Sequence, residues 1–152
     1  GIRHLQNVAF QKSVPDCSGR LPWESARILS AEIEDSTSKD NNNRSLVVEM
    51  EAEGWKMLFT GDIEQQAEDL LARRIQGVHW LKVAHHGSRS SSSPAFLEAI
   101  QPSHCVISSG ANNPFGHPHR ETLARLRTCR IHRTDRGRDV VLRVRGKNFW
   151  IR

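Results

Sequence analysis

The sequence predicts a layered α/β fold. From about residue 45 onward, short apolar or β-branched segments alternate with segments of helical periodicity, and the chain closes with two strand-like segments around a glycine. Strands that alternate with crossover-length helices are typical of a sheet covered by helices, and the closing pair adds an antiparallel element. Hydrophobic residues make up 37% and charged residues 26% of the 152, which favours one globular domain, or a large piece of one, over disorder.

The first 44 residues form a lead-in that carries fewer signals than the body at 45–152. A turn-rich stretch lies near Pro15 and Gly19, and a strand is expected around 26–33. The run 34–44 includes three consecutive asparagines and has no apolar partner positions. We therefore expect a surface loop there.

A β-hairpin and a helix open the body. Segments 45–50 and 55–60 flank Gly54, which is typical of a hairpin. Four apolar residues then recur at helical spacing and predict one buried helix face: Ile63, Ala67, Leu70 and Leu71. Asp62 or a neighbour would cap this helix, and Arg73 and Arg74 would close it favourably against the helix dipole.

The remaining elements continue the alternation. A buried strand is expected at 80–84, and Pro94 begins a helix that ends near residue 100. The later expectations, in order, are a strand at 105–108, a loop at 110–118, a helix at 121–126 with Leu123 and Leu126 inward, a strand at 131–134, and a hairpin of 140–144 and 149–151 across Gly146.

The cysteines, the net charge and the hydropathy limit the classes of protein to which this chain can belong. Cys17, Cys105 and Cys129 are far apart and have no C-x-x-C spacing, so we interpret them as packing residues or free thiols. The net charge is +5, with the basic excess in 120–152, which suits a polyanion or a solvated basic face and is supporting evidence only. No stretch approaches the roughly 20 apolar residues of a membrane span, and no signal-peptide pattern is present, so the chain as given is expected to be soluble.

Polar residues follow three of the predicted strands. Asp62 follows the second hairpin strand, where it is either a metal ligand or a helix N-cap. His85 and His86 follow the next strand, and because neighbouring strand residues point to opposite faces, only one of them serves a given site unless the strand has ended. His117 and His119 follow a third strand and are either site residues or loop residues that cap the next helix. If these strands are neighbours, all three groups lie on one rim of the sheet.

Other polar residues have simpler interpretations. Gly87 and Ser88 form a tight turn suited to an anion such as phosphate. A serine hydrolase is rejected because the chain has no G-x-S-x-G motif, so the serine run at 90–93 is interpreted as a flexible or phosphate-contacting loop. The remaining histidines are expected at the surface or half-buried: His4, His79, His104 and His132.

Four stretches together resemble the C-terminal metallo-hydrolase domain of ComEC-type competence proteins, which act in DNA internalisation. Their order and spacing match over about residues 41–145. The stretches are Asn42–Val48, Leu58–Glu64, Leu81–Ser88 with Ser91–Ser93, and Asn113–His119.

The resemblance implies a metallo-β-lactamase-like αββα sandwich with a pair of divalent metal ions, zinc or manganese, at the sheet edges. By this resemblance Asp62 bridges the metals and His85 ligates one of them, although His86 is an alternative ligand or contacts substrate. Asp62, His86 and His117 form the implied catalytic set, and Ser88 and His119 contact substrate. The implied reaction is hydrolysis of a DNA phosphodiester.

One departure from the family is large. The first metal-binding motif, rich in aspartate and histidine, is absent, and residues 1–40 contain only His4 as a histidine. We therefore expect 1–152 to be the later part of the domain, inactive in isolation, from a longer membrane protein with this domain on the outer side of the cytoplasmic membrane. Its expected partners are DNA, the upstream half of the domain, the parent's membrane channel domain, and a second copy in a dimer.

The alternative is a non-catalytic DNA-binding or assembly module whose metal site has degenerated. An intact metal-binding motif just upstream in the parent would favour the nuclease, and its absence would favour the module.

Overall fold

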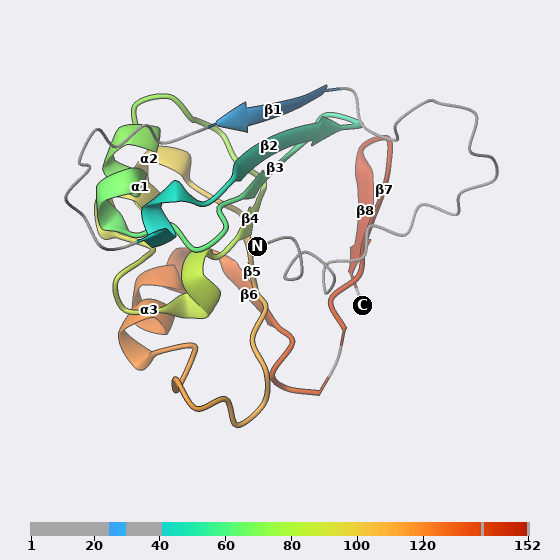
Figure 1. The fold of residues 1–152 in the computed structure, drawn as a ribbon. Coiled ribbons are helices and arrows are strands. Elements are labelled where there is room, and N and C mark those ends of the chain that lie inside the picture. Colours follow the sequence, from blue (N-terminus) through green and yellow to red (C-terminus); the bar gives the residue numbers. More distant parts are fainter. Residues whose placement is uncertain (1–24, 30–40, 138, 152) are drawn as a thin grey trace.

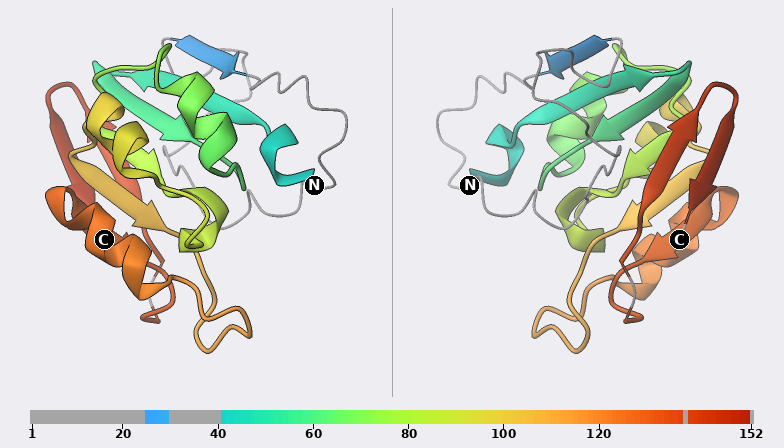
Figure 2. Two further views of the ribbon diagram at one scale, coloured as in Figure 1. Left: turned by 90° about the vertical axis from the view of Figure 1, so that its left-hand side faces the viewer. Right: turned by 90° about the vertical axis from the view of Figure 1, so that its right-hand side faces the viewer.

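A mixed β-sheet with helices on one face and a β-hairpin on the other forms the body of the protein. The computed structural model describes residues 25–29, 41–137 and 139–151. Figure 1 shows the helices on the left of the six-stranded sheet and the hairpin on the right, and Figure 2 views the same layers from the two sides. The α/β class expected from the sequence is confirmed.

The elements lie close to where the periodicity predicts them. The sheet strands are β1 (Ser25–Leu29), β2 (Val47–Ala52), β3 (Trp55–Phe59), β4 (Trp80–Lys82), β5 (His104–Ile107) and β6 (Arg130–Arg133). The helices are α1 (Gln65–Leu71), α2 (Pro94–Ile100) and α3 (Arg120–Arg125), with short 3₁₀ turns η2 (Asn41–Arg44), η3 (Ala84–Gly87) and η4 (Leu126–Thr128). The separate hairpin is β7 (Leu142–Arg145) and β8 (Asn148–Ile151).

The strand order follows the chain from β1 to β6. The first three strands are antiparallel neighbours, and β3 to β6 run parallel. The tight β2–β3 turn is possible because Glu53 and Gly54 both adopt positive φ, 54° and 77°. Each parallel connection needs a crossover, and α1, α2 and α3–η4 supply these on the same face.

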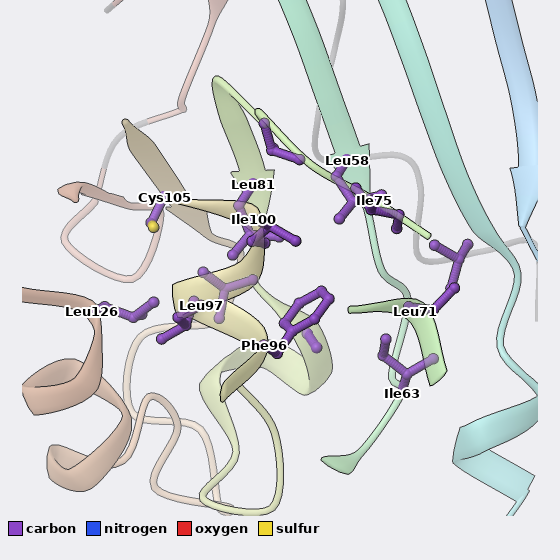
Figure 3. Close-up of a cluster of buried hydrophobic side chains, with 14 of the residues drawn as sticks. Leu58, Ile63, Leu71, Ile75, Leu81, Phe96, Leu97, Ile100, Cys105 and Leu126 are labelled. Atoms are coloured by element: carbon purple, nitrogen blue, oxygen red, sulfur yellow. The ribbon is translucent and has the colours of Figure 1, made fainter. Parts of the chain in front are cut away.

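The main core lies between the sheet and the helices. Figure 3 shows side chains from both layers converging, including Leu58 and Leu81 from the strands and Phe96 and Ile100 from α2. These four side chains are at most 1% exposed. The opposite sheet face carries a second cluster with Met57, Trp80 and Val106, against which hairpin residues such as Phe149 pack. The hairpin thus covers part of the face that the helices leave open.

Helix α1 differs from its expected buried face. Ala67 and Leu71 are fully buried, but Leu70 is 39% exposed and Glu68 occupies an inward position with no exposure. Glu68 is accommodated because its carboxylate accepts the backbone N–H groups of Ser92 and Ser93. The N-cap position is Glu64 rather than Asp62, and its side chain makes no capping hydrogen bond. Arg73 and Arg74 lie beyond the helix end at Leu71.

The serine run is buried, so its interpretation as a flexible or phosphate-contacting loop is wrong for Ser91, Ser92 and Ser93. The Ser91 hydroxyl donates to the Ile63 carbonyl at 2.7 Å, and Ser93 caps α2 by accepting from the Phe96 N–H. Small hydroxyl residues fit here because the α1 and α2 crossovers pack closely. The asparagine run also differs from the expected surface loop, because Asn43 is 6% exposed. Residues 34–40 of that loop and residues 30–33 of the strand expected at 26–33 lie outside the described residues.

Two cysteines expected as packing residues or free thiols form a disulfide instead. Cys105 in β5 bonds to Cys129, which precedes β6, across a sequence separation of 24 residues. The pairing arises because the α3 crossover returns the chain beside β5, with a Cα–Cα distance of 6.0 Å. Cys17 lies outside the described residues. No helix among the described residues has the length and apolar character to cross a membrane.

Candidate functional site

The polar residues singled out in the sequence lie at one end of the parallel strands. Asp62 follows β3, His85 and His86 lie in η3 after β4, and His117 lies in the loop after β5. Because β3, β4 and β5 are parallel neighbours, their C-terminal ends meet at the same edge, as the views in Figure 2 show for η3 and the β5 loop.

The backbone of η3 turns both adjacent histidines toward this edge. The φ angles of His85, His86 and Gly87 are 47°, 54° and 86°, three consecutive residues in the left-handed region. Such a conformation costs a non-glycine residue on the order of 1 kcal/mol and is often found at functional sites. Since the strand has ended before His85, the opposite-face restriction expected for two neighbouring strand residues does not apply.

Two glycines allow the close approach of the segments that form the edge. A Cβ on Gly87 would lie 2.6 Å from Pro118 Cβ, and a Cβ on Gly61 would lie 2.7 Å from Ser45 Cβ. Both glycines have positive φ. Because Gly87 has no Cβ, the His117–Pro118 segment can pack directly against η3. Gly61 in the same way lets the start of the Asp62 turn pack against the segment before β2.

Asp62 and His86 form one of two carboxylate–imidazole pairs at this edge. Asp62 Oδ1 lies 3.6 Å from His86 Nε2, and His86 Nδ1 lies 2.6 Å from the Ser108 carbonyl oxygen. A carbonyl only accepts, so Nδ1 carries the proton and Nε2 of the neutral ring is an acceptor that faces the carboxylate. Two acceptors in this arrangement suit a shared proton or a shared cation.

His85 lies beside Glu64 rather than Asp62. Its Nδ1 is buried without a hydrogen-bond partner, 3.4 Å from Glu64 Oε1. Glu64 Oε1 also accepts a hydrogen bond of 2.8 Å from the Ser90 hydroxyl. The edge therefore holds two carboxylate–histidine pairs side by side.

His117 lies near both histidines of these pairs and is half-buried. Its ring centroid is 5.7 Å from that of His85 and 6.5 Å from that of His86. Burial lowers the pKa of His117, and the neighbouring histidines His119, His85 and His86 lower it further, against the opposing effect of Asp62. A neutral imidazole suits metal binding or proton acceptance.

Ser88 and His119, the residues expected to contact substrate, lie on adjoining segments, because the His119 N–H donates to the carbonyl of Gly87 at 3.0 Å. Ser88 is 7% exposed and its hydroxyl lies 3.0 Å from Ser90 Oγ, so it contacts the serine turn. His119 lies outside it, where Nδ1 accepts the Arg89 backbone N–H at 3.2 Å.

Comparison with known proteins decides the family. ComE operon protein 3 of Bacillus subtilis is 36% identical over 79% of this chain, and Competence protein ComA of Neisseria gonorrhoeae is 32% identical over 89%. Recombination protein 2 of Haemophilus influenzae is 31% identical over 68%. The chain is a ComEC-family homologue. It spans less than a fifth of each relative, 16%, 19% and 13% respectively, and no protein-family model matches it.

Three residues of this ComEC homologue join the site although sequence reasoning did not assign them roles. Glu64 pairs with His85, and Arg89 places a guanidinium nitrogen 3.2 Å from His119 Nε2. Burial lowers the pKa of Lys82 to about 8 even though Asp62 nearby raises it, and its ammonium donates to the Val83 carbonyl at 3.0 Å. All three lie in or beside the stretches that resemble the family. For Lys82, the feature of the sequence that could have indicated a role is a lysine within an otherwise apolar strand.

Among the described residues, no group of three or more His, Cys, Asp or Glu side chains is arranged to hold a metal ion. The facing acceptors of Asp62 and His86 nevertheless fit two ligands of one cation, with His85 and His117 adjacent. A cavity of about 710 Å³ opens elsewhere, between α2 and α3–η4, and none of these site residues lines it.

Proposed function

We propose that this chain contributes part of a metal-dependent phosphodiesterase site to a protein of DNA uptake. The observation that carries the proposal is the Asp62–His86 pair, in which an imidazole with a fixed tautomer turns an acceptor nitrogen toward a carboxylate oxygen 3.6 Å away. The names of the relatives support the biological role, since two of them are a competence protein and a ComE operon protein.

A metallo-β-lactamase-like αββα sandwich is the fold we propose for the complete domain. The layering supports it, because α1, α2 and α3 cover one face of the main sheet while β7–β8 packs as a second, small sheet on the other. In this proposal the rest of the second sheet and its helices come from the parent protein, which in the relatives is much longer than this chain.

The proposed metal ligands from this chain are Asp62 and one of the two adjacent histidines. The geometry favours His86, because His85 faces Glu64 instead. The remaining ligands would come from residues outside the described ranges. A divalent zinc or manganese pair would supply Lewis acidity toward a phosphodiester and acidify bound water.

The chain's own residues would position the substrate. Burial lowers the pKa of His117, and its ring lies close enough to the histidine pairs to accept or transfer a proton near a phosphate. Arg89 and His119 lie farther out, where a cation would bind a neighbouring phosphate. The backbone turn at Ser88 would contact a phosphate of the substrate, and the contact between the Ser88 and Ser90 hydroxyls would hold that turn in place.

Compartment and partners belong to the same proposal. The Cys105–Cys129 disulfide supports a location in an oxidising compartment, on the outer side of the cytoplasmic membrane. The proposed partners are DNA, the upstream half of the domain and the parent's membrane channel domain. A dimer through apolar sheet surface stays a prediction, and sedimentation velocity of the 152-residue chain tests it.

The test compares this chain with a version extended upstream into the parent. Both are incubated with single- and double-stranded DNA plus manganese or zinc, beside the extended version carrying Asp62→Asn. We expect cleavage by the extended protein alone, because only it completes the donor set. Equal cleavage by the short chain would refute the ligand assignment. DNA binding without cleavage by the extended protein would instead favour the non-catalytic DNA-binding module.

A further inference from the structure

An exposed aromatic ring stands beside the candidate site. Phe115 is 73% exposed, the highest value among the exposed large hydrophobic side chains of the described residues. It lies in the 110–118 loop, two positions before His117. Leaving a phenylalanine in water forgoes the stabilisation of about 1.5–3 kcal/mol that burial provides, and it leaves the ring available for contact with a ligand.

The loop that carries Phe115 holds its shape without this side chain. The Asn113 side-chain amide donates to the carbonyls of Gly110 at 2.9 Å and His117 at 2.6 Å, and its oxygen accepts the His117 N–H at 3.0 Å. The Gly116 N–H also donates to the Asn113 carbonyl at 3.2 Å. A pre-formed loop presents the ring at a defined place and loses little conformational entropy on binding.

A row of planar and cationic side chains leads outward from the site. The Phe115 ring lies 5.8 Å from His117, with an interplanar angle of 26°, and His117 lies 4.8 Å from His119. The Arg89 guanidinium lies 3.2 Å from His119 Nε2, and Arg89 is exposed. An open aromatic face on one side of a histidine pair and a cation on the other suit a base and a phosphate of one nucleic-acid strand.

We propose that Phe115 stacks on an unpaired base of a strand bound at the Asp62–His86 edge, so that the site prefers single-stranded over duplex nucleic acid. This inference rests on the proposed function. A base inside a duplex has both faces covered by its neighbours, so an unpaired base offers Phe115 a face that an internal paired base does not. Arg89 contributes the accompanying phosphate contact, which carries no strand preference of its own.

Fluorescence anisotropy with labelled oligonucleotides tests the inference on the full 152-residue chain at low ionic strength. Three ligands are compared: an ordinary single strand, the same strand with abasic residues, and a blunt duplex. The variants are Phe115→Ala, Phe115→Leu, which keeps apolar bulk without a π face, and Phe115→Tyr, which keeps the ring. Trp150→Ala removes an aromatic that is 55% exposed on β8 and serves as the matched control.

Wild type should bind the ordinary strand about 10-fold more tightly than the abasic strand, and Phe115→Ala should remove that difference. Phe115→Leu should behave like Phe115→Ala, whereas Phe115→Tyr and Trp150→Ala should behave like wild type. Duplex affinity should be the same for all five proteins.

The opposite outcomes separate the two proposals. If wild type binds ordinary and abasic strands equally, or if Phe115→Ala binds the ordinary strand as wild type does, base stacking is refuted while DNA binding stands. Unchanged strand binding together with a lower melting temperature of the upstream-extended Phe115→Ala protein would assign the ring to a contact within the parent and also refute stacking. If wild type binds none of the ligands, both the proposed DNA role and the stacking proposal are refuted.

Discussion

Asp62 Oδ1 and His86 Nε2 lie 3.6 Å apart, although each follows a different strand of the sheet. The pair forms because β3 and β4 are parallel neighbours and because His86 Nδ1 is tied to the Ser108 carbonyl beyond β5. Three strand ends thus determine where one nitrogen acceptor points. The orientation of the His86 ring is therefore fixed by the fold itself.

The first prediction separates the two adjacent histidines. In the upstream-extended protein, His86→Ala should weaken zinc affinity more than 10-fold, because the variant removes a ligand whose second nitrogen is already oriented. His85→Ala should have a smaller effect, since His85 faces Glu64. Competition with a chromophoric chelator measures both. A larger loss for His85→Ala would return the ligand role to His85.

The second prediction concerns the buried carboxylate of Glu68. Glu68→Ala should lower the free energy of unfolding by about 3 kcal/mol, because it leaves the buried N–H groups of Ser92 and Ser93 without their acceptor. Asp69→Ala, on the exposed side of the same helix, is the matched control and should change stability little. Urea denaturation measures both, and equal midpoints for the two variants would contradict the prediction.

The third prediction concerns the Cys105–Cys129 disulfide. Cys129→Ala should destabilise the protein by about 3 kcal/mol, the value expected for a closed loop of this length. Thiol reductant should lower the melting temperature of wild type but not of Cys129→Ala, and Cys17→Ala should respond like wild type. Alkylation of the denatured, unreduced protein gives an independent check, because modification of all three cysteines would show that the bond does not form.

The fourth prediction concerns acid sensitivity. His132 Nε2 contacts His104 Nδ1 at 3.1 Å, and burial, followed by the His104 and Arg130 charges, lowers the pKa of His132 to about 4. The unfolded chain binds more protons than the folded one between about pH 4 and 6.5, so stability should fall as the pH is lowered through this window. The loss should be on the order of 1 kcal/mol, because partial exposure screens the effect.

His132→Phe should weaken this pH dependence, leaving the smaller contribution of His104, whose pKa burial also lowers. Melting temperatures measured from pH 4 to pH 8 check the prediction. Above pH 7 the two proteins should differ by a constant offset. Parallel curves over the whole range would assign the acid sensitivity to other groups.

Local patterns in the sequence predicted most individual elements. The β2–β3 hairpin followed from alternating segments around Gly54, and the start of α2 followed from Pro94, because both depend on neighbouring residues alone. The inward face of α1 was partly wrong. Helical spacing favoured Leu70, but Glu68 faces the serine run because two backbone donors there need an acceptor.

By itself, the sequence determined the α/β class, the family resemblance and the strand ends at which Asp62, His86 and His117 lie. Only the tertiary structure decided which histidine faces Asp62, that Glu64 and Lys82 join the edge, and that Cys105 bonds to Cys129. The physical reason is sequence distance. Turns and periodicity act between near neighbours, whereas these pairs exist only after the parallel crossovers have brought separate strands side by side.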